Sequence, residues 1–127
     1  MKITWLHTGD DNRSHFKDVS VPLNQEGAAM RSPLFPGPGA AFSETAAGGS
    51  ASAFHHAPRR QWVVVLSGYM DVEIGDGTVR RFNPGEVFLA DDLTGEGHAV
   101  RPTNGTRCIM TVPVESALDP RGWAAAG

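Results

Sequence analysis

Residues 49–68 read GSASAFHHAPRRQWVVVLSG, and this stretch decides the fold. A glycine stands at each end, and His55 follows the first glycine after five residues. From Gln61 the run QWVVVL is β-branched and apolar on both faces, as a strand in the interior of a sheet would be. Ser67-Gly68 then predicts a turn. The stretch therefore predicts a histidine-bearing loop that leads directly into a buried strand.

Short apolar segments separated by turn residues continue on both sides of this stretch. Fifteen glycines and nine prolines punctuate the chain, which is typical of all-β proteins. Asp76-Gly77 is a strong hairpin signal, because both positions tolerate positive φ. Strands this short and evenly spaced indicate a sandwich or a small barrel. They are predicted at residues 1–6, 16–21, 41–46, 61–66, 69–74, 78–82, 86–90, 97–102 and 107–114.

Three segments lie outside this regular pattern. Residues 1–6 and 16–21 are expected at the edge of a sheet. Residues 24–40 contain six glycines and prolines and predict an ordered loop anchored by Leu34 and Phe35. Residues 115–127 lack apolar density and are expected to form a flexible tail.

Composition limits the class of protein. A chain of 127 residues, 40% hydrophobic, fits one globular domain, taken as residues 1–127. The net charge is −3 with dispersed basic residues, which argues against a nucleic-acid or membrane partner. One cysteine makes no intramolecular disulfide, and the first residues contain no apolar run that would act as a signal peptide. A cytoplasmic location is expected.

The spacing of residues 49–68 resembles the first motif of the cupins, which is a glycine, five residues, a His-x-His pair, a carboxylate and a second glycine. Pro-Gly-Glu at 84–86, followed by a strand, a long loop and His98, resembles the second cupin motif. The resemblance covers residues 49–101 and implies a single-domain jelly-roll barrel, the cupin-type double-stranded β-helix. The variant His-x-Ala-Pro-Arg-Arg-Gln is similar to that of a branch of small single-domain cupins.

Two positions depart from the cupin pattern. A cupin metal is held by three imidazoles and a carboxylate, but Ala57 stands at the second histidine position and Gln61 at the glutamate position. His55, Gln61 and His98 remain as candidate ligands, with no anionic charge to offset a divalent cation. We expect either no cofactor or a weakly bound divalent transition metal (Fe, Mn, Ni or Zn). The alternative is that the two histidines are a hydrogen-bonded interior pair.

Further polar side chains are candidates for binding a substrate. Arg59 and Arg60 could clamp a carboxylate, because a guanidinium matches its geometry. A corner salt-bridged to Asp91 or Asp92 explains the two arginines equally well. Gln61 and Glu44 are also candidate substrate contacts, although a structural amide and a solvent-facing strand carboxylate are the alternatives. An acidic residue of the 91–97 loop could instead orient His98.

The first expected function is an enzyme acting on a small organic molecule, one that can carry a carboxylate, inside the barrel. Isomerase, cyclase or lyase chemistry would use His55 and His98 as catalytic acid and base. One alternative is a non-catalytic module that binds or senses a metabolite, and a second is a metal-dependent dioxygenase. A homodimer paired through the edges of the N-terminal strands is expected.

Overall fold

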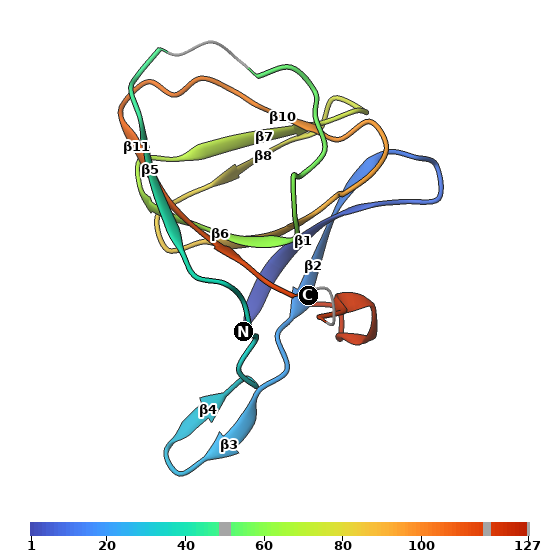
Figure 1. The fold of residues 1–127 in the computed structure, drawn as a ribbon, viewed down its shortest axis with the longest axis vertical. Coiled ribbons are helices and arrows are strands. Elements are labelled where there is room, and N and C mark those ends of the chain that lie inside the picture. Colours follow the sequence, from blue (N-terminus) through green and yellow to red (C-terminus); the bar gives the residue numbers. More distant parts are fainter. Residues whose placement is uncertain (49–51, 116–117, 127) are drawn as a thin grey trace.

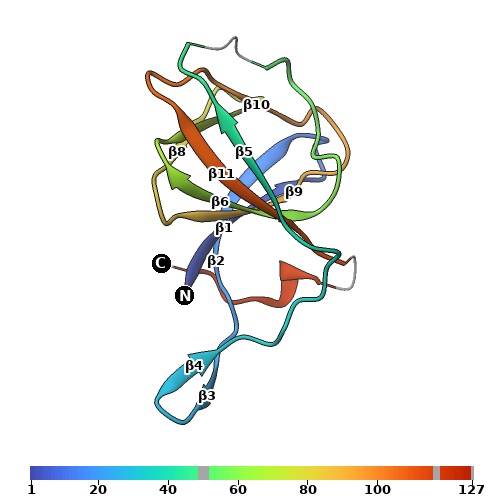
Figure 2. The ribbon, with the colours of Figure 1, turned by 60° about the vertical axis from the view of Figure 1, so that its left-hand side comes forward.

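The computed structural model describes residues 1–48, 52–115 and 118–126, so Gly49 at the start of the first motif lies outside the described residues. Two β-sheets face one another (Figures 1 and 2). The described elements are β1 (Lys2–Thr8), β2 (Ser14–Ser20), β3 (Asn24–Glu26), β4 (Ala29–Arg31), β5 (Ala41–Thr45), β6 (Gln61–Ser67), β7 (Met70–Ile74), β8 (Val79–Phe82), β9 (Val87–Asp91), β10 (His98–Val100), β11 (Arg107–Pro113) and a 3-10 turn, Pro120–Gly122.

The larger sheet has the strand order β2-β1-β9-β6-β11-β5, and the smaller one has the order β10-β7-β8. β1 and β9 are parallel, and the other neighbouring strands of both sheets are antiparallel. All nine predicted strands are present, with ends within two residues of the predicted ones. The predicted all-β, single-domain fold class is therefore confirmed.

An inner hydrophobic cluster fills the space between the two sheets. Alternate residues of a strand face the same side, so one set of positions on each strand points inward. The inner cluster comprises Leu6, Ala57, Val63, Val65, Met70, Val72, Ile74, Phe82, Phe88 and Ala90, all buried. Since the cluster draws on both sheets, its burial holds the barrel together.

An outer hydrophobic cluster covers the opposite face of the larger sheet. Its buried members are Ile3, Trp5, Val19, Val21, Leu89 and Val114. Trp123, which follows the 3-10 turn, packs here with Phe35, their ring centroids 5.9 Å apart, and Phe35 lies 5.7 Å from Trp62. The larger sheet is thus apolar on both faces, which explains the unbroken apolar run at 62–66.

Several expectations for the outer segments are wrong. β1 lies inside the larger sheet between β2 and β9, so residues 1–6 do not form an edge. The 24–40 segment contains the β3–β4 hairpin, and Leu34 is 90% exposed, so of the two expected anchors only Phe35 packs. The described part of the expected flexible tail is packed, and the amide of Ala126 donates to the carbonyl of Asp18. No helix in the described residues is long and apolar enough to cross a membrane.

Candidate functional site

His98 points into the barrel from the first position of β10. It lies opposite Ile74 on β7, and Val100 lies opposite Val72. Ile74 and Val72 belong to the inner cluster, so the register places the His98 side chain on the inward face. His98 is 6% exposed, which puts an imidazole at the boundary between the apolar core and the barrel rim.

His55 lies directly beside His98. The two residues form an isolated antiparallel bridge, each amide donating to the other's carbonyl at 2.9 and 2.8 Å, and their ring centroids are 4.8 Å apart. Gly97 makes this approach possible, because a Cβ there would lie 2.1 Å from the His55 carbonyl and its φ is +77°. His55 is exposed, so the pair joins an accessible imidazole to a buried one.

A buried carboxylate supports His98 from behind. Asp92 follows β9 and is completely buried, and its Oδ2 lies 2.6 Å from His98 Nδ1. Ser14 Oγ donates to the same oxygen at 2.7 Å, and the amide of Ala57 donates to the Asp92 carbonyl. These contacts fix the carboxylate, and the carboxylate in turn fixes the His98 ring.

The hydrogen bonds also define which nitrogen of each histidine is available. A carbonyl or carboxylate oxygen only accepts, so His98 Nδ1 donates to Asp92 and His55 Nδ1 donates to the carbonyl of Ala53 at 2.9 Å. In the neutral tautomers that follow, Nε2 of each ring carries the lone pair. Two imidazoles with this polarity can act as a base and, after protonation, as an acid.

The residues present do not fit the metal of the cupin pattern. The described residues contain no group of three or more His, Cys, Asp or Glu side chains that could hold a metal ion. Ala57 contributes only a methyl group, and the Gln61 amide oxygen accepts from Arg59 Nε at 3.4 Å. Asp92 Oδ2 is committed to Ser14 and His98, and its Oδ1 is buried without a partner in the described residues. Two imidazoles alone lack the ligand number and the charge that a tightly held transition metal needs.

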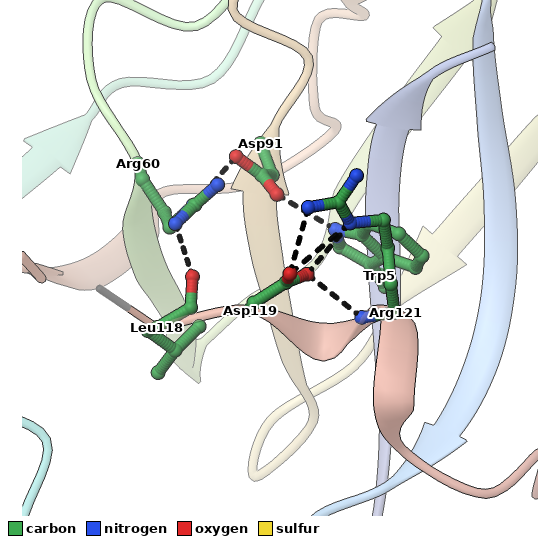
Figure 3. A network of polar contacts seen from close by, with 6 residues as sticks. All are labelled: Trp5, Arg60, Asp91, Leu118, Asp119 and Arg121. Atoms are coloured by element: carbon green, nitrogen blue, oxygen red, sulfur yellow. Dashed lines mark hydrogen bonds and ion pairs between the residues drawn. The ribbon is translucent and has the colours of Figure 1, made fainter. Parts of the chain in front are cut away.

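Two of the other predicted substrate contacts, Arg60 and Glu44, have partners away from the histidines. Arg60 Nε donates to Asp91 Oδ1 at 2.7 Å, and a second nitrogen donates to the carbonyl of Leu118. Figure 3 shows this network on the outer face, where Trp5 Nε1 donates to the other oxygen of Asp91 at 2.9 Å. Glu44 is exposed and contacts the thiol of Cys108 at 3.5 Å. The alternative of a salt bridge to Asp91 is therefore confirmed for Arg60.

A cavity of about 510 Å³ lies on the outer face beside this network. Trp5, His7, Arg60 and Asp91 contribute to its wall together with the exposed pair Asp119 and Arg121. Both oxygens of Asp91 are already hydrogen-bonded. The buried groups of this wall are therefore satisfied within the protein and join the C-terminal segment to the sheet.

Ser14 and Arg107 have notable buried polar groups but were not predicted as site residues from the sequence. Ser14 meets Asp92 across 78 positions of sequence, and no local pattern predicts so distant a contact. Arg107 is buried at the start of β11 and was read only as part of a strand. An arginine opening the apolar run Arg-Cys-Ile-Met was a signal that could have found it.

Comparisons with known proteins add only a general likeness. No protein-family model matches the chain, and no curated protein matches it. Solved structures similar to it include a cupin 2 conserved barrel domain protein from Salinispora arenicola, with 18% identity over 80% of this chain and 82% of that one and a TM-score of 0.49. The Schizosaccharomyces pombe Cnp3 cupin domain has 16% identity over 92% and 85%, with a TM-score of 0.48. The polyketide cyclase RemF from Streptomyces resistomycificus has 18% identity over 91% and 72%, with a TM-score of 0.45. No conclusion about ligand or reaction follows from likenesses at this level.

Proposed function

We propose that the protein is an enzyme that performs acid–base chemistry on a small organic molecule at the rim of the barrel. His98 acts as the general base and His55 as the neighbouring acid. Asp92 is a positioning residue that acts through His98. The reactions that need only these groups are isomerisation, cyclisation and elimination, in which a proton leaves one atom and another is delivered nearby. No step depends on a metal.

The Asp92–His98 contact is the observation that carries this proposal. A purely structural histidine needs a partner for its ring, but it does not need a second imidazole whose own Nδ1 is also committed. Here the 2.6 Å contact to Asp92 and the 2.9 Å contact from His55 to Ala53 leave both Nε2 atoms as lone-pair donors. Two oriented bases 4.8 Å apart between ring centroids suit proton transfer on a substrate of a few atoms' width.

The step that isomerisation, cyclisation and elimination share is removal of a proton from carbon. Purified protein is incubated in D2O with pyruvate, 2-oxobutyrate and levulinate, and proton NMR follows exchange of the hydrogens beside the carbonyl. We expect faster exchange than in buffer for at least one of these keto acids. His98→Ala should lower that rate by about 100-fold, the scale of a general base.

His56→Ala is the matched control, because His56 is an exposed histidine adjacent to the pair. It should leave the exchange rate unchanged, and Asp92→Asn should shift the pH profile of exchange as a positioning residue does. Exchange at the buffer rate with all three keto acids, or equal loss in the His56 and His98 variants, would contradict the proposal.

A binding or sensor function is the second candidate, and the packed inner cluster favours it. The ten buried members of that cluster leave the histidines at the rim rather than deep inside a solvated barrel. A sensor would hold a metabolite there without turning it over. Saturation-transfer NMR with the same keto acids would then show binding to the wild type without exchange of their C–H protons.

The homodimer also belongs to this proposal. β2 and β5 are the edges of the larger sheet, and Phe42 on β5 is 72% exposed. Unpaired strand edges of this kind can pair with a second copy. Sedimentation at high concentration should show a dimer, and a monomer under those conditions would contradict this part of the proposal.

A further inference from the structure

Arg107 faces the inside of the barrel from the first position of β11. The pairing of β11 with β5 is regular there, with Arg107 opposite Thr45 and Cys108 opposite Glu44. The contact between the Cys108 thiol and the exposed Glu44 carboxylate places that pair on the outer side. Arg107 therefore has the opposite orientation, the same as Ile109, which packs against the inner cluster. The register shift between Cys108 and Ile109 occurs in the pairing with β6, where Leu66 is the extra residue, so the alternation along β11 is kept.

The guanidinium of Arg107 is buried without a partner for two of its nitrogens. The residue is 8% exposed, and neither Nε nor Nη1 has a hydrogen-bond partner among the described residues. Burial lowers the pKa of Arg107, and the negative charge of Asp71 opposes this effect. Arginine nevertheless stays charged in proteins, so a positive charge with unsatisfied donors lies inside the fold.

The nearby acids do not satisfy this charge. Asp71 is held by two hydrogen bonds from Arg81, at 2.8 and 2.9 Å, which lower the pKa of its carboxyl group. Glu44 lies on the opposite side of the sheet, beside Cys108. An unpaired buried charge costs several kcal/mol, whereas the pairing of a charge with an anion recovers much of that cost. The donors of Arg107 are thus set up for an anion from outside the chain.

We propose that Arg107 anchors an anion-binding site that takes the carboxylate of a small organic ligand, at the end of the barrel where β11 begins. One guanidinium supplies one positive charge and a planar set of donors, which matches a carboxylate monoanion. A phosphate dianion would need further cations, and the two other arginines in electrostatic contact with Asp71 are already paired, Arg81 with Asp71 itself and Arg101 with Glu73.

This site lies apart from the histidines. Gly68, just before β7, lies against Arg107, since a Cβ there would be 3.1 Å from the Arg107 Cα. His98 is opposite Ile74 at the other end of β7, roughly 13 Å further along the strand at 3.3 Å per residue. The carboxylate site therefore does not depend on acid–base chemistry at His98, and either could exist without the other.

The test uses the purified full chain and follows its thermal unfolding. Sodium benzoate, sodium acetate and sodium phosphate are titrated separately, with sodium chloride keeping the ionic strength constant. A ligand that binds only the folded state raises the unfolding temperature with concentration. We expect benzoate and acetate to raise it, and Arg107→Met to weaken carboxylate binding at least about tenfold. Without carboxylate, Arg107→Met should unfold at the same temperature as the wild type or higher, because an unpaired charge has been removed.

Arg101→Met is the matched control, since Arg101 is a half-exposed arginine already paired with Glu73, and it should keep the carboxylate response. His98→Ala should keep the response as well. The proposal is overturned by a wild type that does not respond to carboxylates, by a full response in Arg107→Met, by loss of the response in His98→Ala, or by a larger response to phosphate. A lower unfolding temperature of Arg107→Met without carboxylate would also overturn it.

A second measurement tests the wild type directly and does not depend on the stability of Arg107→Met. Uniformly ¹⁵N-labelled wild type is titrated with benzoate, and the Nε–H signal of Arg107 is identified by its disappearance in Arg107→Lys. We expect that signal to shift with saturation. A stationary Arg107 signal would overturn the proposal.

Discussion

Arg60 and Arg107 are two largely covered arginines of neighbouring strands, and the molecule treats them in opposite ways. Arg60, just before β6, lies on the outer face and donates to Asp91 and to the carbonyl of Leu118 (Figure 3). Arg107, at the start of β11, lies on the inner face with Nε and Nη1 unpartnered among the described residues. The buried polar groups around Asp91 on the outer face are hydrogen-bonded, whereas Nε and Nη1 of Arg107 on the inner face are not, among the described residues.

The difference between the two arginines distinguishes a structural role from a binding role. A satisfied buried ion pair ties the C-terminal segment to the sheet and needs nothing more. An unsatisfied buried cation, and a buried Asp92 carboxylate whose Oδ1 also lacks a partner in the described residues, cost stability and persist only where another role requires them. The two ends of the barrel, at His98 and at Arg107, rather than the outer cavity, are therefore where we expect a ligand.

The largest effect should come from removing the acid at the centre of the outer network. The Asp91 side chain is 5% exposed and accepts from both Arg60 and Trp5. Asp91→Ala removes the carboxylate partner of a covered guanidinium and of an indole N–H, and should lower the free energy of unfolding by about 3–5 kcal/mol. Asp119→Ala, which removes an exposed acid of the same network, is the control and should change it by less than about 1 kcal/mol. Urea denaturation measures both, and equal losses would contradict the distinction.

The second prediction compares the two arginines directly. Arg60→Met should lower the free energy of unfolding by about 2–3 kcal/mol, because Asp91 keeps only its bond from Trp5. Arg107→Met should change it by about zero or raise it, because no protein partner is lost. Urea denaturation of both variants in chloride buffer, without carboxylate, gives the comparison. Two similar losses would mean that the inner arginine is structural too.

Trp123 tests whether the outer face depends on the C-terminal segment. Its ring packs with Phe35 and Trp62 and is only partly covered. Trp123→Ala should therefore cost about 1–2 kcal/mol, less than a fully buried aromatic residue. Arg121→Ala, two residues before it and 79% exposed, should cost less than about 0.5 kcal/mol. An unchanged unfolding midpoint for Trp123→Ala would restore the flexible tail that composition suggested.

The strands were predictable because their signals are local. Turn residues and apolar runs mark the nine strands of the two facing sheets within a few positions, whereas the β3–β4 hairpin lacks an apolar run and was missed. Two outer features were not predictable in this way. β1 became an inner strand through its parallel pairing with β9, more than 80 residues away, and the C-terminal segment packs through Leu118, Pro120 and Trp123.

The candidate site was predictable only where a motif fixes spacing. His55 and His98 were expected inside the barrel, and the backbone bridge at Gly97 brings them together. The partners of polar groups were harder, because hydrogen bonds join residues far apart in sequence. Arg59 and Arg60 looked like a carboxylate clamp, yet Arg60 pairs with Asp91, and Arg107 has two buried nitrogens without a partner in the described residues.

The smallest effect concerns His7 on the outer face, where its ring stacks on Trp5 with centroids 4.1 Å apart. Burial lowers the pKa of His7, and the hydrogen bond at Thr8 opposes this only in part. Between the folded pKa and the ordinary value near 6.5, the unfolded chain binds more protons at this position than the folded one. Protonation therefore favours unfolding, and stability falls as the pH drops from about 7 through the folded pKa.

His7→Gln should remove this part of the pH dependence, a difference of less than about 1 kcal/mol between pH 7 and pH 5. Urea denaturation of wild type and variant at both pH values measures it. A variant whose stability falls as steeply as that of the wild type would show that His7 is as easily protonated in the fold as in the unfolded chain. The outer face would then be wetter than its completed hydrogen bonds suggest, and its contrast with the inner face would weaken.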